Sequence, residues 1–144
     1  MKADAQTEAE IKALGENVWK EYARKDLEAS MGLWTSDPDL VAMGTGADEL
    51  RLGPEELRRG LRRDFAQAED IEITTEWLSI SAAGNVAWSA ANARLSGTID
   101  GEAATLLCRL STVYEKRNGT WQIMLLHLSL PAAEQELGHS WPQP

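Results

Sequence analysis

Three side chains that could bind an organic molecule lie on one expected strand. The pattern predicts a strand from Val86 to about Thr98, and Trp88, Asn92 and Arg94 occur on it at even spacings. Successive strand residues point to opposite faces, so these three share a face. If that face lines an apolar pocket, the guanidinium would bind a carboxylate or an enolate-like oxygen, with the amide beside it. The alternative is an arginine at a strand end, paired with an acidic residue near the rim.

Few residues in the chain could act as nucleophiles or metal ligands. Its only histidines are His127 and His139, and its only cysteine is Cys108. These numbers exclude a cysteine-rich or histidine-rich metal site and an intrachain disulfide, and a catalytic pair of the two histidines is not expected. We therefore expect no metal and no cofactor. Cys108 lies in an apolar run with Leu106 and Leu110, which indicates an inert core thiol.

Length and charge limit the classes of partner. With 144 residues, 43% of them hydrophobic, the chain fits one compact domain. Its 14 basic and 23 acidic residues leave a net charge of -9, which disfavours nucleic acid and anionic membranes as partners. Residues 1–6 lack the apolar core of a signal peptide, and no stretch reaches the roughly 18 apolar residues of a membrane span. The sequence predicts a cytoplasmic protein. Several of its six tryptophans are expected to line a cavity.

The first half of the chain has helical spacing. Apolar residues at intervals of three and four predict a helix over 7–24, with Thr7 and Glu10 in capping-box spacing. Asp26 can cap a second, short helix, and a third runs from Pro54 to about Ala68. A short strand over 39–43 lies between the second and third helices.

From Ile71 onward, apolar residues alternate with polar ones at a spacing of two, which is typical of strands. The apolar set changes parity near Trp77, which predicts a bulge there. Turns at 83–85, 100–101 and 118–119 then separate strands over 86–98, 103–116 and 121–130. Three helices and a long antiparallel meander indicate an α+β fold, whose curled sheet encloses a pocket under the helices. We expect one domain over 1–131, followed by a tail over 132–144.

Several segments resemble the nuclear transport factor 2-like superfamily, and its SnoaL-like branch most closely. They are Lys25–Glu28 between the first helices, Trp34–Asp39 before the first strand, Gly53 at the third helix, and Asn118–Ile123 with His127–Ser129 in the last strand. The resemblance covers about residues 7 to 131 and implies a cone-shaped fold. The superfamily includes isomerases, dehydratases, cyclases and epoxide hydrolases, and also proteins that only bind or assemble.

The resemblance extends to the association domain of calcium/calmodulin-dependent protein kinases, through Arg94–Leu95, Ile99–Gly101 and Trp121–Ser129. It implies that Arg94 is a pocket arginine. Two further pocket arginines of that domain would fall on Thr112 and Leu128, so only one member of the cluster is present.

Comparison with ketosteroid isomerase relatives tests for their three catalytic groups. The phenol position falls near Val18, the base position on Met43 and the second acid near Thr112, so none of the three is retained. Isomerase chemistry with that set of residues is not expected. Tyr22, one turn beyond Val18, either reaches the pocket or packs with its hydroxyl at the rim.

The resemblance also assigns alternate residues of the last strand to the pocket. His127 would then point to the convex face, where it either lies at a subunit interface or does acid/base work. Candidate catalytic residues are Arg94, Asn92, Tyr22, Thr112, Tyr114 and His127. The expected pocket comprises Val18, Tyr22, Trp34, Met43, Trp88, Asn92, Arg94, Leu110, Thr112, Tyr114, Met124, Leu126 and Leu128.

Two functions remain open at this point. One is a cofactor-independent lyase, isomerase or cyclase that acts on a hydrophobic carbonyl or carboxylate compound. The other is a ligand-binding or oligomerisation module of the same fold that catalyses nothing. In both cases we expect a small-molecule ligand and a homodimer through the convex face of the sheet, because the strands carry apolar residues of both parities.

Overall fold

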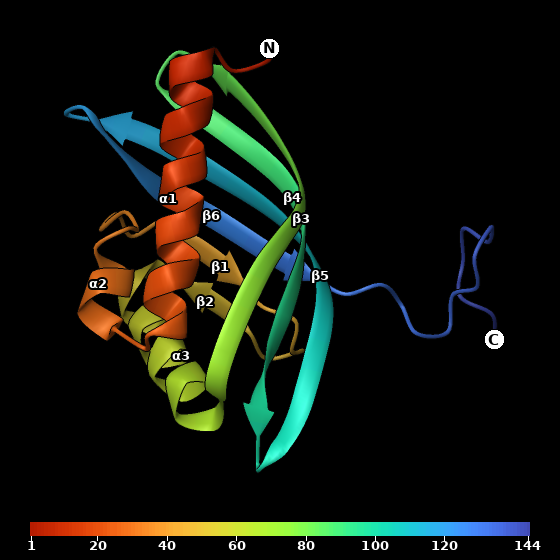
Figure 1. The fold of residues 1–144 in the computed structure, drawn as a ribbon. Coiled ribbons are helices and arrows are strands. Elements are labelled where there is room, and N and C mark those ends of the chain that lie inside the picture. Colours follow the sequence, from red (N-terminus) through yellow and green to blue (C-terminus); the bar gives the residue numbers. More distant parts are fainter.

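The computed structural model describes all 144 residues and contains three helices and six strands (Figure 1). The helices are α1 (Ala5–Ala23), α2 (Leu27–Met31) and α3 (Gly53–Gln67). The strands are β1 (Val41–Met43), β2 (Leu50–Leu52), β3 (Glu69–Ala83), β4 (Val86–Ile99), β5 (Glu102–Arg117) and β6 (Thr120–Ser129). The expected α+β fold, with its helices on one face of a strongly curved sheet, is confirmed.

The strands form one mixed sheet in the order β2-β1-β6-β5-β4-β3. The β3 to β6 meander is antiparallel, as expected, whereas β1 pairs in parallel with β6 and antiparallel with β2. The sequence reading missed β2, because three residues are too few to show a period. As a result, the sheet has one more strand than expected, and the segment before α3 is tied to its edge.

Local signals explain where the helices begin. The Asp4 side chain accepts a hydrogen bond from the Thr7 amide at 2.8 Å, so Asp4 caps α1 in place of the expected pair of Thr7 and Glu10. Asp26 caps α2 as expected, at 2.9 Å from the Ala29 amide. In α3, Pro54 stands in the first turn, where its missing amide proton removes no helical bond.

Two-residue turns determine which side chains share a face in β4 and β5. Asp100 and Gly101 have positive φ angles of 51° and 81°, and Ile99 pairs directly with Glu102. From that pair onward, Ala91 lies opposite Leu110, and Arg94 lies opposite Leu107. Odd-numbered residues of β4 therefore share the concave face with even-numbered residues of β5.

Two bulges shift this alternation elsewhere in the sheet. The pairing of β3 with β4 shifts between Thr75 and Trp77, which agrees with the bulge expected near Trp77. The pairing of β5 with β6 shifts after Tyr114, which pairs with Ile123, and Met124 is the extra residue. Trp121 and Ile123 are therefore buried on the concave side in the first half of β6, and Leu126 in the second.

The core lies between the concave face and the helices. Its most buried side chains include Ile11 of α1, Leu57 of α3, Ile123 of β6 and Leu40, each exposed by 1% or less. A polar tie joins α1 to the β5-β6 hairpin. Glu10 accepts hydrogen bonds from Lys116 and from the Trp121 indole, both at 2.7 Å. Together these contacts hold α1 across the concave face (Figure 1).

Residues after β6 contain no helix or strand, and they extend away from the sheet (Figure 1). Leu137 and Trp141 in this segment are exposed. None of the three helices has the length and apolar character needed to cross a membrane.

Candidate functional site

Two cavities lie between the helices and the concave face of the sheet. The first, here the α3 cavity, has a volume of about 280 Å³ and lies among α3, the C-terminal half of α1 and strands β1 and β2. The second, here the α1 cavity, has a volume of about 400 Å³ and lies under the N-terminal half of α1 against β3, β4 and β5. Fifteen of the 22 residues that line the α3 cavity are hydrophobic, so its few polar groups determine what it can recognise.

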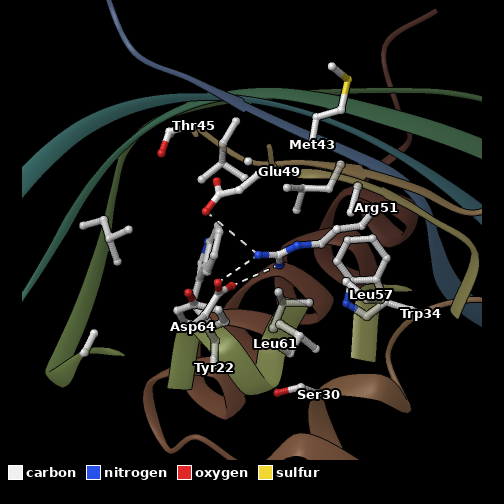
Figure 2. A pocket seen from close by; sticks show the side chains of 18 of the residues that line it. Tyr22, Ser30, Trp34, Met43, Thr45, Glu49, Arg51, Leu57, Leu61 and Asp64 are labelled. Carbon is white, nitrogen blue, oxygen red and sulfur yellow. Dashed lines mark hydrogen bonds and ion pairs between the residues drawn. The ribbon is translucent and has the colours of Figure 1, made fainter. Parts of the chain in front are cut away.

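A charged group occupies one end of the α3 cavity (Figure 2). Arg51 of β2 donates two hydrogen bonds to Asp64 of α3, from Nη1 to Oδ2 at 3.0 Å and from Nη2 to Oδ1 at 2.8 Å. Only 12% of the Arg51 side chain and 17% of the Asp64 side chain are exposed. This two-bond geometry aligns the carboxylate with the guanidinium and keeps both charges in place.

Glu49 completes this charged group from the segment before β2. Its Oε1 lies 4.0 Å from Arg51 Nη2 and 3.3 Å from Arg63 Nη2, and its Oε2 accepts a hydrogen bond from the Gly46 amide at 2.9 Å. Within the cavity, one guanidinium therefore stands between two carboxylates. With Arg51 bonded to Asp64 and Arg63 bonded to Glu49, no unpaired positive charge is left for an anionic ligand, whereas a neutral oxygen-bearing ligand needs none.

Tyr22 of α1 contributes a phenol to the same end of the cavity (Figure 2). Burial, together with the negative charge of Asp64 facing the hydroxyl, raises the pKa of Tyr22 well above its usual value. The phenol therefore keeps its proton at every physiological pH and acts as a hydrogen-bond donor. Its ring packs edge-on against Phe65, with the ring centroids 5.2 Å apart, which fixes the direction of the hydroxyl.

Gly60 makes room for the arginine on the buried face of α3. A Cβ atom at this position would overlap the Arg51 side chain. Glycine disfavours a helix interior by about 1 kcal/mol relative to alanine, so its presence here needs a steric reason. That reason is the passage of Arg51 over α3 toward Asp64, one turn further along the helix.

Ser30 of α2 also lines the α3 cavity, and only 5% of the residue is exposed. Its Oγ has no hydrogen-bond partner in the structure. A buried hydroxyl without a partner is unfavourable in the ligand-free protein.

Most of the expected pocket residues do line these cavities. Those at the α3 cavity are Val18, Tyr22, Trp34, Met43, Leu126 and Leu128. Those at the α1 cavity are Val18, Leu110, Thr112, Tyr114 and Leu126. Their contact with a ligand stays a prediction.

The expected orientation of Arg94, Asn92 and Trp88 was wrong. Arg94 lies on the convex face, where its Nε and Nη2 each lie 3.0 Å from Glu76 Oε1 and half of its side chain is exposed. Asn92 is exposed on the same face, and Trp88 alternates with the buried Ala87 and Ser89. The two-residue turn at Asp100 and Gly101 is the reason, because it places the concave residues of β5 opposite odd-numbered residues of β4. The cavity arginine is Arg51.

In the last strand, β6, the structure agrees with the orientation expected for His127 and differs from the one expected for Met124. His127 is exposed and lies between Leu126 and Leu128, which line the α3 cavity, so it points to the convex face as expected. Met124 lines neither of the two cavities, because it is the extra residue of the bulge. Its expected place in the pocket was therefore wrong.

The sequence reading missed Glu49, Arg51 and Asp64. One signal was present, since Asp64 follows Leu57 by seven residues and Leu61 by three, which places a carboxylate on the apolar face of α3. A charge on a buried helix face needs a partner, and that requirement points to a basic residue nearby. Nothing in a strand as short as β2 identifies Arg51 as that partner.

Comparison with known protein families identifies the chain. A model of the SnoaL-like domain matches residues 11–133. The chain belongs to this family. A search of the curated proteins finds no match for this SnoaL-like domain.

Solved structures share the fold of this SnoaL-like domain at low sequence identity. A nuclear transport factor 2-like superfamily protein from Salmonella enterica has a TM-score of 0.85 at 16% identity, over 96% of this chain and 100% of that one. A proposed dehydratase of the NTF2-like family from Streptomyces avermitilis has a TM-score of 0.80 at 17% identity, over 87% and 97%. A proposed calcium/calmodulin-dependent protein kinase II association domain from Xanthomonas campestris has a TM-score of 0.76 at 21% identity, over 86% of this chain and 87% of that one.

Proposed function

We propose that the α3 cavity binds a small, largely apolar ketone or related neutral carbonyl compound, and that the protein catalyses proton transfer next to the carbonyl without a cofactor. Isomerases, lyases and cyclases that act next to a carbonyl group share this step. The observation that carries the proposal is the Asp64 carboxylate beside the protonated Tyr22 phenol, at the polar end of an otherwise apolar cavity. Because each arginine there is already paired with a carboxylate, the site favours a neutral carbonyl over a carboxylate substrate.

The proton transfer assigns a role to each side chain. The Asp64 carboxylate takes a proton from the carbon next to the carbonyl, and the electron pair of that bond moves onto the carbonyl oxygen. Tyr22 donates a hydrogen bond to the enolate oxygen so formed. Arg51 holds the carboxylate in position through its two hydrogen bonds. Return of the proton to the same or another carbon regenerates Asp64.

One observation favours binding without catalysis as the second candidate function. Both Asp64 oxygens accept hydrogen bonds from Arg51, an arrangement that would also suit a purely structural ion pair. In that case the cavity holds its ligand and leaves it unchanged.

Hydrogen exchange in heavy water separates the two functions. Decan-2-one is incubated with the protein in D₂O, and deuterium incorporation next to the carbonyl is measured by NMR. We expect exchange faster than in buffer, lost in Asp64→Asn and reduced in Tyr22→Phe, with binding of the ketone retained by calorimetry. The control is Glu72→Gln, which changes an exposed carboxylate of β3 that lines neither cavity.

Binding without faster exchange would leave only the ligand-binding function. Equal exchange in the wild type and in both cavity variants would refute the roles given to Asp64 and Tyr22. Because loss of Asp64 also weakens folding, the folded fraction of each variant is measured under the same conditions, and Tyr22→Phe keeps the test open if Asp64→Asn unfolds.

A further inference from the structure

The two cavities have three wall residues in common, Val18, Trp19 and Leu126. Val18 and Trp19 are consecutive residues of α1, and Leu126 faces them from β6. Side chains that border two cavities form the partition between them. Val18 and Trp19 are only half-buried, so this partition consists of side chains with free space on both sides.

The α1 cavity contains three buried hydroxyl groups on the concave wall, from Ser89, Thr112 and Tyr114. Each of these residues is exposed by 7% or less, and the Ser89 and Tyr114 oxygens lie 3.0 Å apart in a hydrogen bond. Burial raises the pKa of Tyr114, so this phenol also keeps its proton. The surrounding wall is apolar, which leaves these hydroxyls as the deep polar contacts of the cavity.

The charges at the rim of the α1 cavity indicate which ligands it excludes. Glu8, Glu16 and Glu76 line it together with one basic residue, Lys12. An anionic group would be repelled by this surplus of carboxylates, whereas a neutral hydroxyl or carbonyl would not. The α1 cavity therefore favours the same class of neutral ligand as the α3 cavity.

We infer that the two cavities are two halves of one elongated binding site, and that its substrate is a long, neutral molecule with an oxygen at each end. This inference rests on the proposed function and adds the shape of the substrate to it. The carbonyl lies at Tyr22 and Asp64, the apolar middle passes the partition, and the second oxygen bonds to the Ser89 and Tyr114 pair. Volumes of about 280 and 400 Å³ lie at the lower end of the range of about 300 to 1,000 Å³ usual for ligand sites, and together they fall near its middle.

A pair of ketones that differ at the far end tests the inference. Decan-2-one and 10-hydroxydecan-2-one are titrated by calorimetry into the wild type, Tyr114→Phe and Ser89→Ala. We expect the hydroxyketone to bind about three- to tenfold more tightly than the ketone, the effect of one additional hydrogen bond. Tyr114→Phe should remove that advantage while leaving the affinity for decan-2-one unchanged. The matched control is Ser111→Ala, a hydroxyl of the same strand that is exposed on the convex face.

A variant that blocks the passage between the two cavities provides an independent test. Val18→Phe adds a ring between the cavities, and we expect it to weaken binding of both long ketones at least tenfold and to weaken binding of pentan-2-one much less. If the hydroxyl confers no advantage, or if Val18→Phe affects pentan-2-one and decan-2-one alike, the two cavities are separate and the inference is wrong.

The outcomes also distinguish this inference from the function on which it rests. Deuterium exchange that depends on Asp64, without any effect of Tyr114, would support the proposed function and overturn the elongated site. Failure of all three ketones to bind would overturn both.

Discussion

Removing Asp64 should destabilise the fold strongly, whereas removing the whole ion pair should not. In Asp64→Asn the Arg51 guanidinium, only 12% exposed, loses the opposite charge of Asp64 and one of its two short hydrogen bonds, because the amide of asparagine keeps a single acceptor oxygen. Glu49, at 4.0 Å, is then its only carboxylate neighbour in the cavity. Breaking a buried pair on one side costs about 3–5 kcal/mol, because an unpaired charge stays buried. The remaining carboxylate and the slight exposure reduce this figure, so we expect a loss of about 2–3 kcal/mol.

The expected loss corresponds to a large change in melting temperature. For a domain of this size, 1 kcal/mol shifts the midpoint by roughly 3–4 °C, so Asp64→Asn should melt about 6–12 °C lower. The double variant Arg51→Met with Asp64→Leu removes both charges and should lie within about 1 kcal/mol of the wild type. Urea unfolding followed by tryptophan fluorescence measures both quantities, and the cycle of single and double variants isolates the coupling.

An exposed ion pair provides the matched control for this experiment. Glu76→Gln breaks the Arg94–Glu76 pair, whose side chains are 50% and 46% exposed, and it should change the stability by no more than about 0.5 kcal/mol. If Asp64→Asn is no more harmful than Glu76→Gln, or if the double variant is less stable than Asp64→Asn, the Arg51–Asp64 pair is not the buried charge pair described above.

Four further outcomes are expected. Hydrogen bonds from Lys116, Gln6 and Trp121 lower the pKa of Glu10 to about 2. The contribution of Glu10 to folding stability is therefore complete above pH 4.5 and is lost as the pH falls toward 2. Glu10→Gln should be less stable than the wild type in urea at pH 7, and the difference in stability should disappear at acid pH. Ser30→Ala should raise the free energy of unfolding by about 1 kcal/mol, since it removes a buried hydroxyl without a partner, and lower stability would show that the hydroxyl is satisfied. Gly60→Ala should melt below the wild type despite the better helix propensity of alanine, because its methyl group displaces Arg51; a higher melting point would contradict this packing. The homodimer through the convex face stays a prediction, supported by Leu107 at 52% exposure, and light scattering should show a dimer that Leu107→Asp converts to monomer.

The fold could be read from the sequence because its signals are local and repeated. Helical spacing, capping aspartates and glycine-containing turns each identify an element without knowledge of the others. The orientation of Arg94 could also be predicted from the sequence. An Asp-Gly pair at 100–101 is the typical loop of a two-residue hairpin, and counting back from Ile99 and Glu102 places Arg94 opposite Leu107 and not on the face of Leu110. The wrong orientation of β4 came from its resemblance to a pocket strand, which conflicts with the register that this turn imposes.

Other parts of the site depend on features that no local pattern contains. The bulge at Met124 exchanges the faces of β6 partway along the strand. Residues 123–126 are all apolar, so they hide the change of parity that revealed the bulge near Trp77. The partnership of Arg51 with Asp64 arises only when a three-residue strand joins the edge of the sheet and brings its arginine over α3. Charged pairs of this kind are chosen by the folded geometry, so a single sequence shows the carboxylate but not its partner.

The charged end of the α3 cavity comes from one short stretch of chain. Glu49, Arg51, Gly60 and Asp64 all lie within residues 49–64, whereas the apolar walls come from elements spread along the whole chain, from α1 to β6. A single exchange of this stretch between related genes would therefore replace the charged groups as a set and leave the long strands β3 to β6 and the phenol of Tyr22 unchanged. Exchange of this stretch alone is one route by which the same fold can acquire a new reaction and still bind ligands of the same shape.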